Sequence, residues 1–173
     1  MARATAPPFR SLAPDTRPEP RTAFEVALHR LLDDLFAAQP TWATQIGFHA
    51  HDDRWPDPTE SGRASRLRML RHHRAALAGL PADQLSPEET VDRGIVLEAI
   101  DELEFHEDVL RQDSWDPLQY VYQMGTGFFA LLAREFAPWA HRGAAFLGRL
   151  QSLPSFVAGA AAALVGLPDR PVS

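Results

Sequence analysis

The sequence predicts an all-α fold, an irregular bundle of about five to six helices preceded by a Pro-rich leader. Three observations lead to this prediction. Apolar residues recur at three- and four-residue steps over most of the chain. Helix-start signals stand between these segments, the strongest being Ser86-Pro87-Glu88-Glu89. No segment of useful length shows the alternation of apolar and polar residues, with a period of two, that is typical of a half-buried strand.

The leader, residues 1–21, differs from the rest of the chain in composition. Few of its side chains are large and apolar, and its first twenty residues contain five prolines, Pro7, Pro8, Pro14, Pro18 and Pro20. Burial cannot offset the ordering entropy of such a segment, so we expect it to be disordered. The remainder, residues 22–173, is predicted to be one helical domain, the N-terminal part of a larger architecture.

The first helix is predicted from Thr22 to about Pro40. It presents one apolar stripe, formed by Phe24, Leu28, Leu31, Leu32, Leu35 and Phe36. A short helix or turn should follow at residues 41–48, with Trp42 and Ile46 packed inward. Residues 49–58 are then expected to form an ordered loop.

Two long helices are predicted next. Thr59 can cap a helix that runs to about Ala78. The second begins after Ser86 and continues to about Arg111. Its expected buried face consists of Val91, Ile95, Ala99, Leu103 and Leu110, with Ile100 alongside.

Two or three further helices are predicted in the C-terminal part of the chain. Residues 120–136 are rich in apolar side chains and should be buried on several sides. Pro138 can open a helix that runs to about Leu153, with Phe146, Leu147 and Leu150 inward. Pro154 is expected to open a last, Ala-rich helix.

Composition excludes several classes of function. The net charge is −6, and no block of basic residues is present, which argues against a nucleic-acid partner. Cysteine is absent, so thiol chemistry and Cys-ligated zinc are excluded. The longest apolar stretch, residues 156–167, is shorter than the roughly 20 residues that a membrane helix needs. We therefore expect no membrane partner and a cytoplasmic location.

Histidines are the only candidates for metal ligands or catalytic bases. His106-Glu107 begins like the H-E-x-x-H zinc helix, but Leu110 stands where the second His should be. His49 and His51, beside Asp52 and Asp53, could form half of a metal site. Alternatively, the two Asp residues cap a tight loop and the His side chains form local hydrogen bonds.

The other histidine pair, His72-His73, lies between arginines and is typical of a solvated helix face. No Gly-x-Ser-x-Gly motif, phosphate-binding Gly loop or dinucleotide fingerprint occurs in the sequence. The sequence thus predicts no catalytic residue, no metal ligand and no cofactor for this chain.

Several segments, taken in order, resemble the N-terminal region of the bacterial family called domain of unknown function 885. They are residues 40–47, with the sequence Pro-Thr-Trp-Ala-Thr-Gln-Ile-Gly, then His49, Asp52 and Trp55-Pro56-Asp57, then residues 116–120, 133–138 and 149–154. The resemblance implies a large, mostly helical protein similar to zinc metallopeptidases. The metal site that it implies lies beyond the matched region, so none of its ligands is transferred here. His49, Asp52 and Tyr120 match family positions, and no role is assigned to them.

The sequence therefore predicts the helical scaffold portion of a metal-dependent hydrolase- or peptidase-like protein, truncated before its metal site and without activity of its own. Zinc is implied only for full-length members of the family. The expected partner is a C-terminal catalytic half. The alternative is a stand-alone helical interaction module that forms a homodimer or binds another protein.

Overall fold

The computed structural model describes residues 18–164, so most of the predicted leader lies outside the described part of the chain. Within that part the fold is all-α and no strand occurs, which confirms the predicted fold class. The α-helices are α1 (Ala23–Ala38), α2 (Pro40–Ile46), α3 (Glu60–Ala78), α4 (Pro87–Phe105), α5 (Pro117–Ala133) and α6 (Trp139–Ala163). A π-helical turn, His106–Leu110, and a 3₁₀ turn, Gln112–Ser114, connect α4 to α5.

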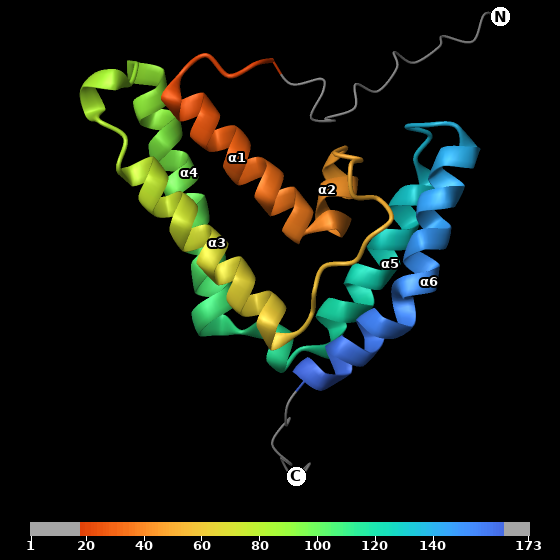
Figure 1. Ribbon diagram of the computed structural model, residues 1–173. Helices are drawn as coiled ribbons and strands as arrows, with labels where there is room; N and C mark the ends of the chain where they lie inside the picture. The colour runs from red at the N-terminus through yellow and green to blue at the C-terminus, as the bar shows by residue number, and fades with distance from the viewer. Residues whose placement is uncertain (1–17, 165–173) are drawn as a thin grey trace, which may run out of the picture.

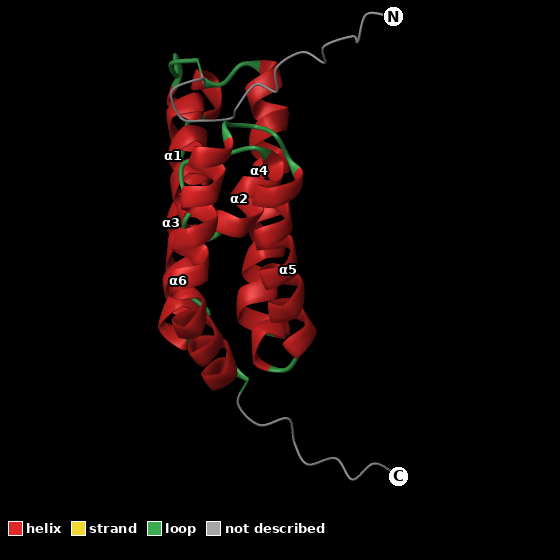
Figure 2. Ribbon diagram, turned by 90° about the vertical axis from the view of Figure 1, so that its right-hand side faces the viewer, coloured by secondary structure: helices red, strands yellow, loops and turns green. Residues whose placement is uncertain are grey.

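The helices form a V with two arms (Figure 1). One arm consists of α1, α3 and α4, and the other is the antiparallel pair α5 and α6, which lie side by side in Figure 2 as well. The short helix α2 contacts both α1 and α5 and thereby joins the arms. The loop from residue 47 to residue 59 runs between them toward the point of the V.

Local signals place the helix starts where the sequence predicts them. Thr22 and Ser86 each form a capping box, with Glu25 and Glu89 respectively, and Thr59 accepts a hydrogen bond from the Gly62 N–H. These bonds satisfy backbone donors that have no partner inside the helix.

The core of the first arm differs from the predicted one at α4. Ile100 is buried there together with Phe24, Leu31, Leu70 and Leu77, which belong to α1 and α3. Val91 and Ile95, which were expected to face inward, are 62% and 59% exposed, so that prediction is wrong. Both stripes of α4 are apolar, and the one that meets α1 and α3 is the neighbouring stripe of Val96, Leu97, Ile100 and Leu103.

The prediction for α2 is also wrong. Trp42 and Ile46 are 41% and 37% exposed, whereas Thr41, Ala43 and Thr44 are buried. The small side chains are buried because this side of α2 lies against α5. At the same contact Gly127 of α5 has no room for a side chain, since an added Cβ would lie 2.8 Å from the Trp55 ring.

In the second arm, α6 is one helix that continues through Pro154, although the sequence predicted a break there. Proline removes one backbone hydrogen bond, but Leu153, Phe156 and Ala160 pack against Tyr120 on either side of it. Leu147 and Leu150 are about half exposed, contrary to expectation, and Ala145 and Arg149 are buried instead. The predicted burial of α5 holds only for the sides that α2 and α6 cover, and its remaining side is exposed.

Candidate functional site

The loop that carries His49 and Asp52 begins at a glycine. Gly47 ends α2 with a left-handed backbone, φ 96°, and donates hydrogen bonds to the carbonyls of Ala43 and Thr44. Left-handed conformations suit glycine because it has no Cβ. The chain reverses there, so Phe48 is buried against Phe36 and Ala43, and residues 49–54 turn back toward α2.

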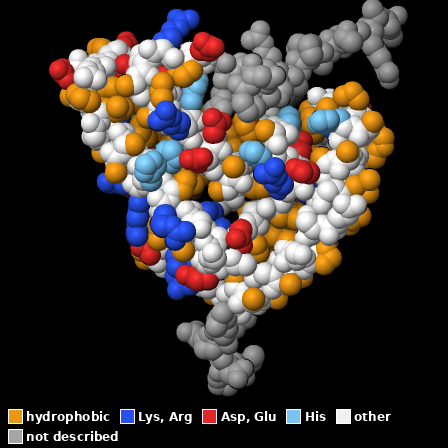
Figure 3. All heavy atoms as spheres, viewed as in Figure 1, with side chains coloured by type: hydrophobic (Ala, Val, Ile, Leu, Met, Phe, Trp, Pro, Cys, Tyr) orange, Lys and Arg blue, Asp and Glu red, His pale blue; other side chains and the backbone are white. Residues whose placement is uncertain are grey.

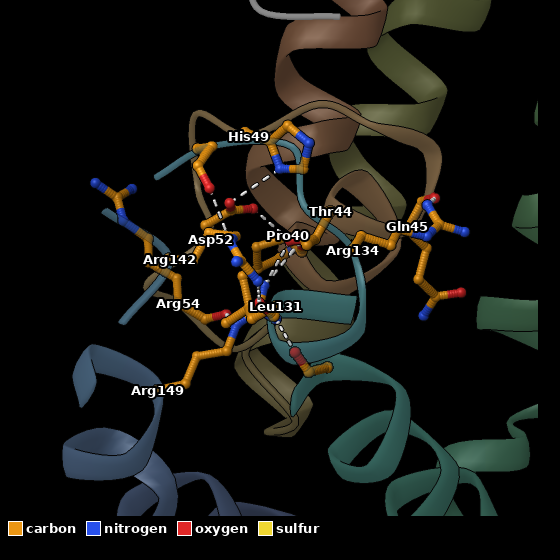
Figure 4. Close-up of polar contacts among 12 residues, drawn as sticks. Pro40, Thr44, Gln45, His49, Asp52, Arg54, Leu131, Arg134, Arg142 and Arg149 are labelled. Atoms are coloured by element: carbon orange, nitrogen blue, oxygen red, sulfur yellow. Dashed lines mark hydrogen bonds and ion pairs between the residues drawn. The ribbon is translucent and has the colours of Figure 1, made fainter. Parts of the chain in front are cut away.

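His49 and Asp52 form a buried pair within this turn (Figure 4). The Nδ1 atom of His49 lies 2.9 Å from Oδ2 of Asp52, and the other carboxylate oxygen accepts a 2.7 Å hydrogen bond from the Thr44 hydroxyl. Asp52 is only 4% exposed. The His49 ring stacks on Phe136, with ring centroids 3.5 Å apart. His49 therefore makes a local hydrogen bond, as in the second of the two interpretations that the sequence left open.

Behind this pair lies a fully buried arginine, Arg149 of α6. Its guanidinium donates to the carbonyls of Arg54, Gly127 and Pro40 and, over 2.7 Å, to the Thr44 hydroxyl (Figure 4). Burial lowers the pKa of Arg149 to about 10, and Asp52 opposes this shift. The group therefore stays charged at neutral pH.

The arrangement clamps the second arm to α2 and to the loop. One cation reaches acceptors in three separate segments, and Thr44 links it to the carboxylate of Asp52. Asp52 occupies Nδ1 of His49, which leaves the Nε2 atom of this ring as its free acceptor or donor. Within residues 18–164 no hydroxyl group makes a hydrogen bond to His49, so the pair lacks a nucleophile partner.

Sequence reasoning gave Arg149 no role, although it lies in a segment that carries the family resemblance. The signal that could have found it is one charged residue at an inward position of an otherwise apolar helix stripe. A second arginine of this kind is Arg142. It donates to the carbonyls of Leu131, Leu132 and Ala137 and so satisfies the end of α5.

Tyr120 is not part of the His49–Asp52 site. It is buried against Phe156, and its hydroxyl donates a 2.8 Å hydrogen bond to the carbonyl of Asp113. Burial raises the pKa of Tyr120 to about 12, and the negative charge of Asp113 adds to the shift. Tyr120 is therefore neutral at physiological pH and serves as a donor.

Beside Tyr120 lies a polar pocket between the arms, which we call the inter-arm pocket. It has an empty volume of about 530 Å³ including its open mouth. Its polar lining includes Gln39, Asp57, Arg66, His106, Glu107, Asp113, Tyr120 and Gln123. Three of these, His106, Glu107 and Asp113, lie in the irregular connector of α4 and α5, where Arg111 adopts a left-handed backbone with φ 45°.

The remaining histidines form no common site with His49: His72 and His73 are neighbours whose ring centroids lie 5.3 Å apart, and the others have separate surroundings. His51 faces the Phe48 ring, and burial lowers its pKa. His73 is buried, and its Nε2 atom lies 2.8 Å from Oδ2 of Asp34, so the prediction that His73 is solvated is wrong. Glu107, next to His106, is bound by Arg66. Across residues 18–164 no three His, Asp or Glu side chains are grouped in a way that could hold a metal ion.

No helix among the described residues is both long and apolar enough to cross a membrane.

Comparison with known proteins gives one family and one solved structure. Curated proteins contain no match to the chain. The structure is described as "a putative lipoprotein of unknown function" from Shewanella oneidensis. It superposes with a TM-score of 0.74 at 25% identity over 84% of this chain. The match covers 26% of that protein, so this chain spans about a quarter of its length.

The family is that of bacterial proteins of unknown function called DUF885, whose sequence profile matches residues 40–169. The match includes α2 with its Thr44, the His49–Asp52 turn, Tyr120 and Arg149. It covers well over half of the 173 residues. The chain therefore belongs to the bacterial DUF885 family.

Proposed function

We propose that this chain is the helical scaffold portion of a metal-dependent hydrolase- or peptidase-like protein, without catalytic activity of its own. In this proposal its second arm packs against a C-terminal catalytic half and forms one wall of the cleft of that half. The metallopeptidase-like character comes from the family resemblance of the sequence. The metal ligands would belong to the other half.

One observation carries the proposal: α5 and α6 expose apolar surface that bears no charge. We call this surface the apolar stripes. They consist of Leu118, Val121, Tyr122, Phe129 and Leu132 on α5 and Trp139, Leu147, Leu150 and Val157 on α6. Each of these side chains is between 44% and 69% exposed. Large exposed apolar surface marks an interaction site.

The charge distribution strengthens this interpretation. Between residues 117 and 133 no Asp, Glu, Lys or Arg occurs, and α6 contains only Arg142 and Arg149, which are both buried. Charged residues are likewise depleted from the cores of protein interfaces. The other arm carries many charged side chains (Figure 3), and arginines of α3 pair there with carboxylates of α4 and of the π-helical turn that follows it. The first arm also exposes apolar side chains, such as Val91 and Ile95 of α4, but only on the second arm is the exposed apolar surface free of Asp, Glu, Lys and Arg among the described residues.

The small share of the Shewanella oneidensis protein that the match covers supports the same proposal. The helices described here correspond to about a quarter of the Shewanella oneidensis protein, so in that protein most of the chain lies outside the shared part. A surface that would face the rest of such an architecture is expected to be apolar. The apolar stripes meet this expectation.

Association measured by light scattering after size-exclusion chromatography tests the proposal. The chain is mixed with the remainder of the Shewanella oneidensis protein, produced without the quarter that matches. We expect a 1:1 complex, which Phe129→Asp abolishes because it places a charge in an apolar stripe. Val91→Asp, at an equally exposed site on the other arm, should leave the complex intact. Equal loss with both variants would contradict the proposal.

The same experiment separates the alternative function, a stand-alone interaction module. A chain that forms a homodimer by itself, and that Phe129→Asp converts to a monomer, would favour this module over the scaffold. A purified chain that retains zinc and hydrolyses peptides would refute both. A cytoplasmic location and the absence of nucleic-acid and membrane partners remain predictions from the sequence.

A further inference from the structure

The inter-arm pocket contains polar side chains that have no partner. Gln39, Asp113 and Gln123 line it, each half-buried. In the described part of the chain none of their side-chain atoms makes a hydrogen bond, although the backbone carbonyl of Asp113 accepts one from Tyr120. Their polar atoms remain accessible from the pocket, so these three side chains can bind a ligand or water there.

The charges around the pocket leave it negative. Arg66 is neutralised by Glu107, whose two carboxylate oxygens lie 2.6 and 3.0 Å from its guanidinium. The nearby Arg63 is engaged by Glu60 and by the carbonyl of Glu107. Among residues 18–164 the carboxylate of Asp113 makes no ion pair, although Arg63 is close enough to interact with its charge, and that charge helps to raise the pKa of Tyr120.

Asp57 also lines the pocket: its carboxylate accepts the Thr59 N–H and makes no ion pair among the described residues, while its backbone carbonyl accepts a hydrogen bond from Arg66. The carboxylates of Asp57 and Asp113 and the amide oxygens of Gln39 and Gln123 are all hydrogen-bond acceptors. Carboxylates bind ammonium and guanidinium groups by charge-assisted hydrogen bonds, and these are the stronger kind. The pocket therefore favours a ligand that is both cationic and rich in N–H donors.

We propose that the inter-arm pocket binds an alkylammonium or guanidinium group, with Asp113 as its ion-pair partner and Gln39 and Gln123 as acceptors. The group would belong either to a free amine or to a Lys or Arg side chain of a peptide. None of these three residues belongs to the apolar stripes. The inference goes beyond the scaffold role and stands or falls separately from it.

Isothermal titration calorimetry of the full chain tests this site with three probes. Agmatine represents the free amine, and Nα-acetyl-arginine amide represents the peptide side chain. Nα-acetyl-citrulline amide has nearly the same shape but no charge. We expect at least one guanidinium compound to bind with a dissociation constant of about 1 mM or lower. The compound that binds more tightly identifies the source of the group.

Substitutions then locate the binding. Asp113→Asn keeps the shape of the side chain and removes its charge, and should weaken binding by about tenfold or more. Asp83→Asn, at an exposed site in the connector of α3 and α4, is the matched control and should change nothing. Gln123→Leu provides a second variant if Asp113→Asn does not fold.

Three results would each overturn the inference. They are the absence of binding by both guanidinium compounds at about 10 mM, equal binding of the citrulline compound, and unchanged affinity in a folded Asp113→Asn or Gln123→Leu variant. Any of them would mean that the pocket holds water only.

Discussion

At the scale of single residues, Arg149 determines how α6 is held. It is a buried cation that forms no ion pair with a carboxylate of residues 18–164, and its hydrogen bonds reach α2, the loop and α5. Trp55 reinforces the contact, because its ring lies beside the guanidinium and its Nε1–H donates to the Arg149 carbonyl. Removing such a group takes a donor away from several acceptors in the core, although the Pro40 carbonyl keeps the Thr44 hydroxyl as a donor.

We predict that Arg149→Met lowers the free energy of unfolding by about 3–5 kcal/mol, because the guanidinium no longer donates hydrogen bonds to the buried acceptors around it. Arg149→Lys should recover only part of this loss, since an ammonium cannot reproduce the planar array of donors. Urea unfolding followed by circular dichroism measures both.

Arg134→Met is the control for this prediction. Arg134 is exposed and makes one hydrogen bond, to the Gln45 carbonyl (Figure 4), so its loss should cost less than about 1 kcal/mol. If Arg149→Met and Arg134→Met destabilised the chain equally, the clamp would not have the importance assigned to it.

The same residues show what the sequence could predict of the site. His49 and Asp52 are three positions apart, so their pairing follows from a local turn and was within reach of sequence reasoning. Arg149 meets Thr44 across 105 positions, and nothing local in the sequence specifies that contact. Tyr120 matches a family position as His49 does, yet it lies in a different site.

At the scale of helices, close contact between α5 and α2 depends on Gly127. A Cβ at this position would lie 2.8 Å from the Trp55 ring and 3.1 Å from the Thr41 methyl group, and neither can move easily in a packed core. Gly125 lies on the same helix, but a Cβ there would meet nothing within 4 Å.

We therefore expect opposite outcomes for two identical substitutions in α5. Gly127→Ala should destabilise the chain by about 1–3 kcal/mol through overpacking. Gly125→Ala should be neutral or stabilise it by up to about 1 kcal/mol, because alanine favours the helix. Thermal unfolding of the two variants gives the comparison, and a stabilising Gly127→Ala would disprove the close approach of α5 to Trp55.

Helix starts were predictable because a cap is a local structure of four residues, as at Thr22 and Ser86. The buried faces of the helices were harder to predict. In α4 the two apolar stripes are equivalent in the sequence, and only the positions of α1 and α3 select Ile100 over Ile95. At Pro154 tertiary packing overrides the local tendency of proline to end a helix.

At the scale of the whole molecule, the two arms differ in surface chemistry. The arm of α1, α3 and α4 carries paired charges, whereas the apolar stripes of α5 and α6 carry none. Composition alone could not predict this segregation, because it depends on which stripes remain uncovered after the arms have packed. It is the basis for our proposals that the chain is a scaffold and that its second arm is the docking surface.

Hydroxyl-radical footprinting tests that assignment most directly, by comparing the chain alone with the chain mixed with the remainder of the Shewanella oneidensis protein. We predict that Tyr122, Phe129 and Trp139 of the apolar stripes react when the chain is alone and are protected in the mixture. Phe105 and Trp115, which are about half exposed outside the stripes, should react equally in both. Protection of Phe105 and Trp115 with undiminished reaction at the stripes would contradict the account.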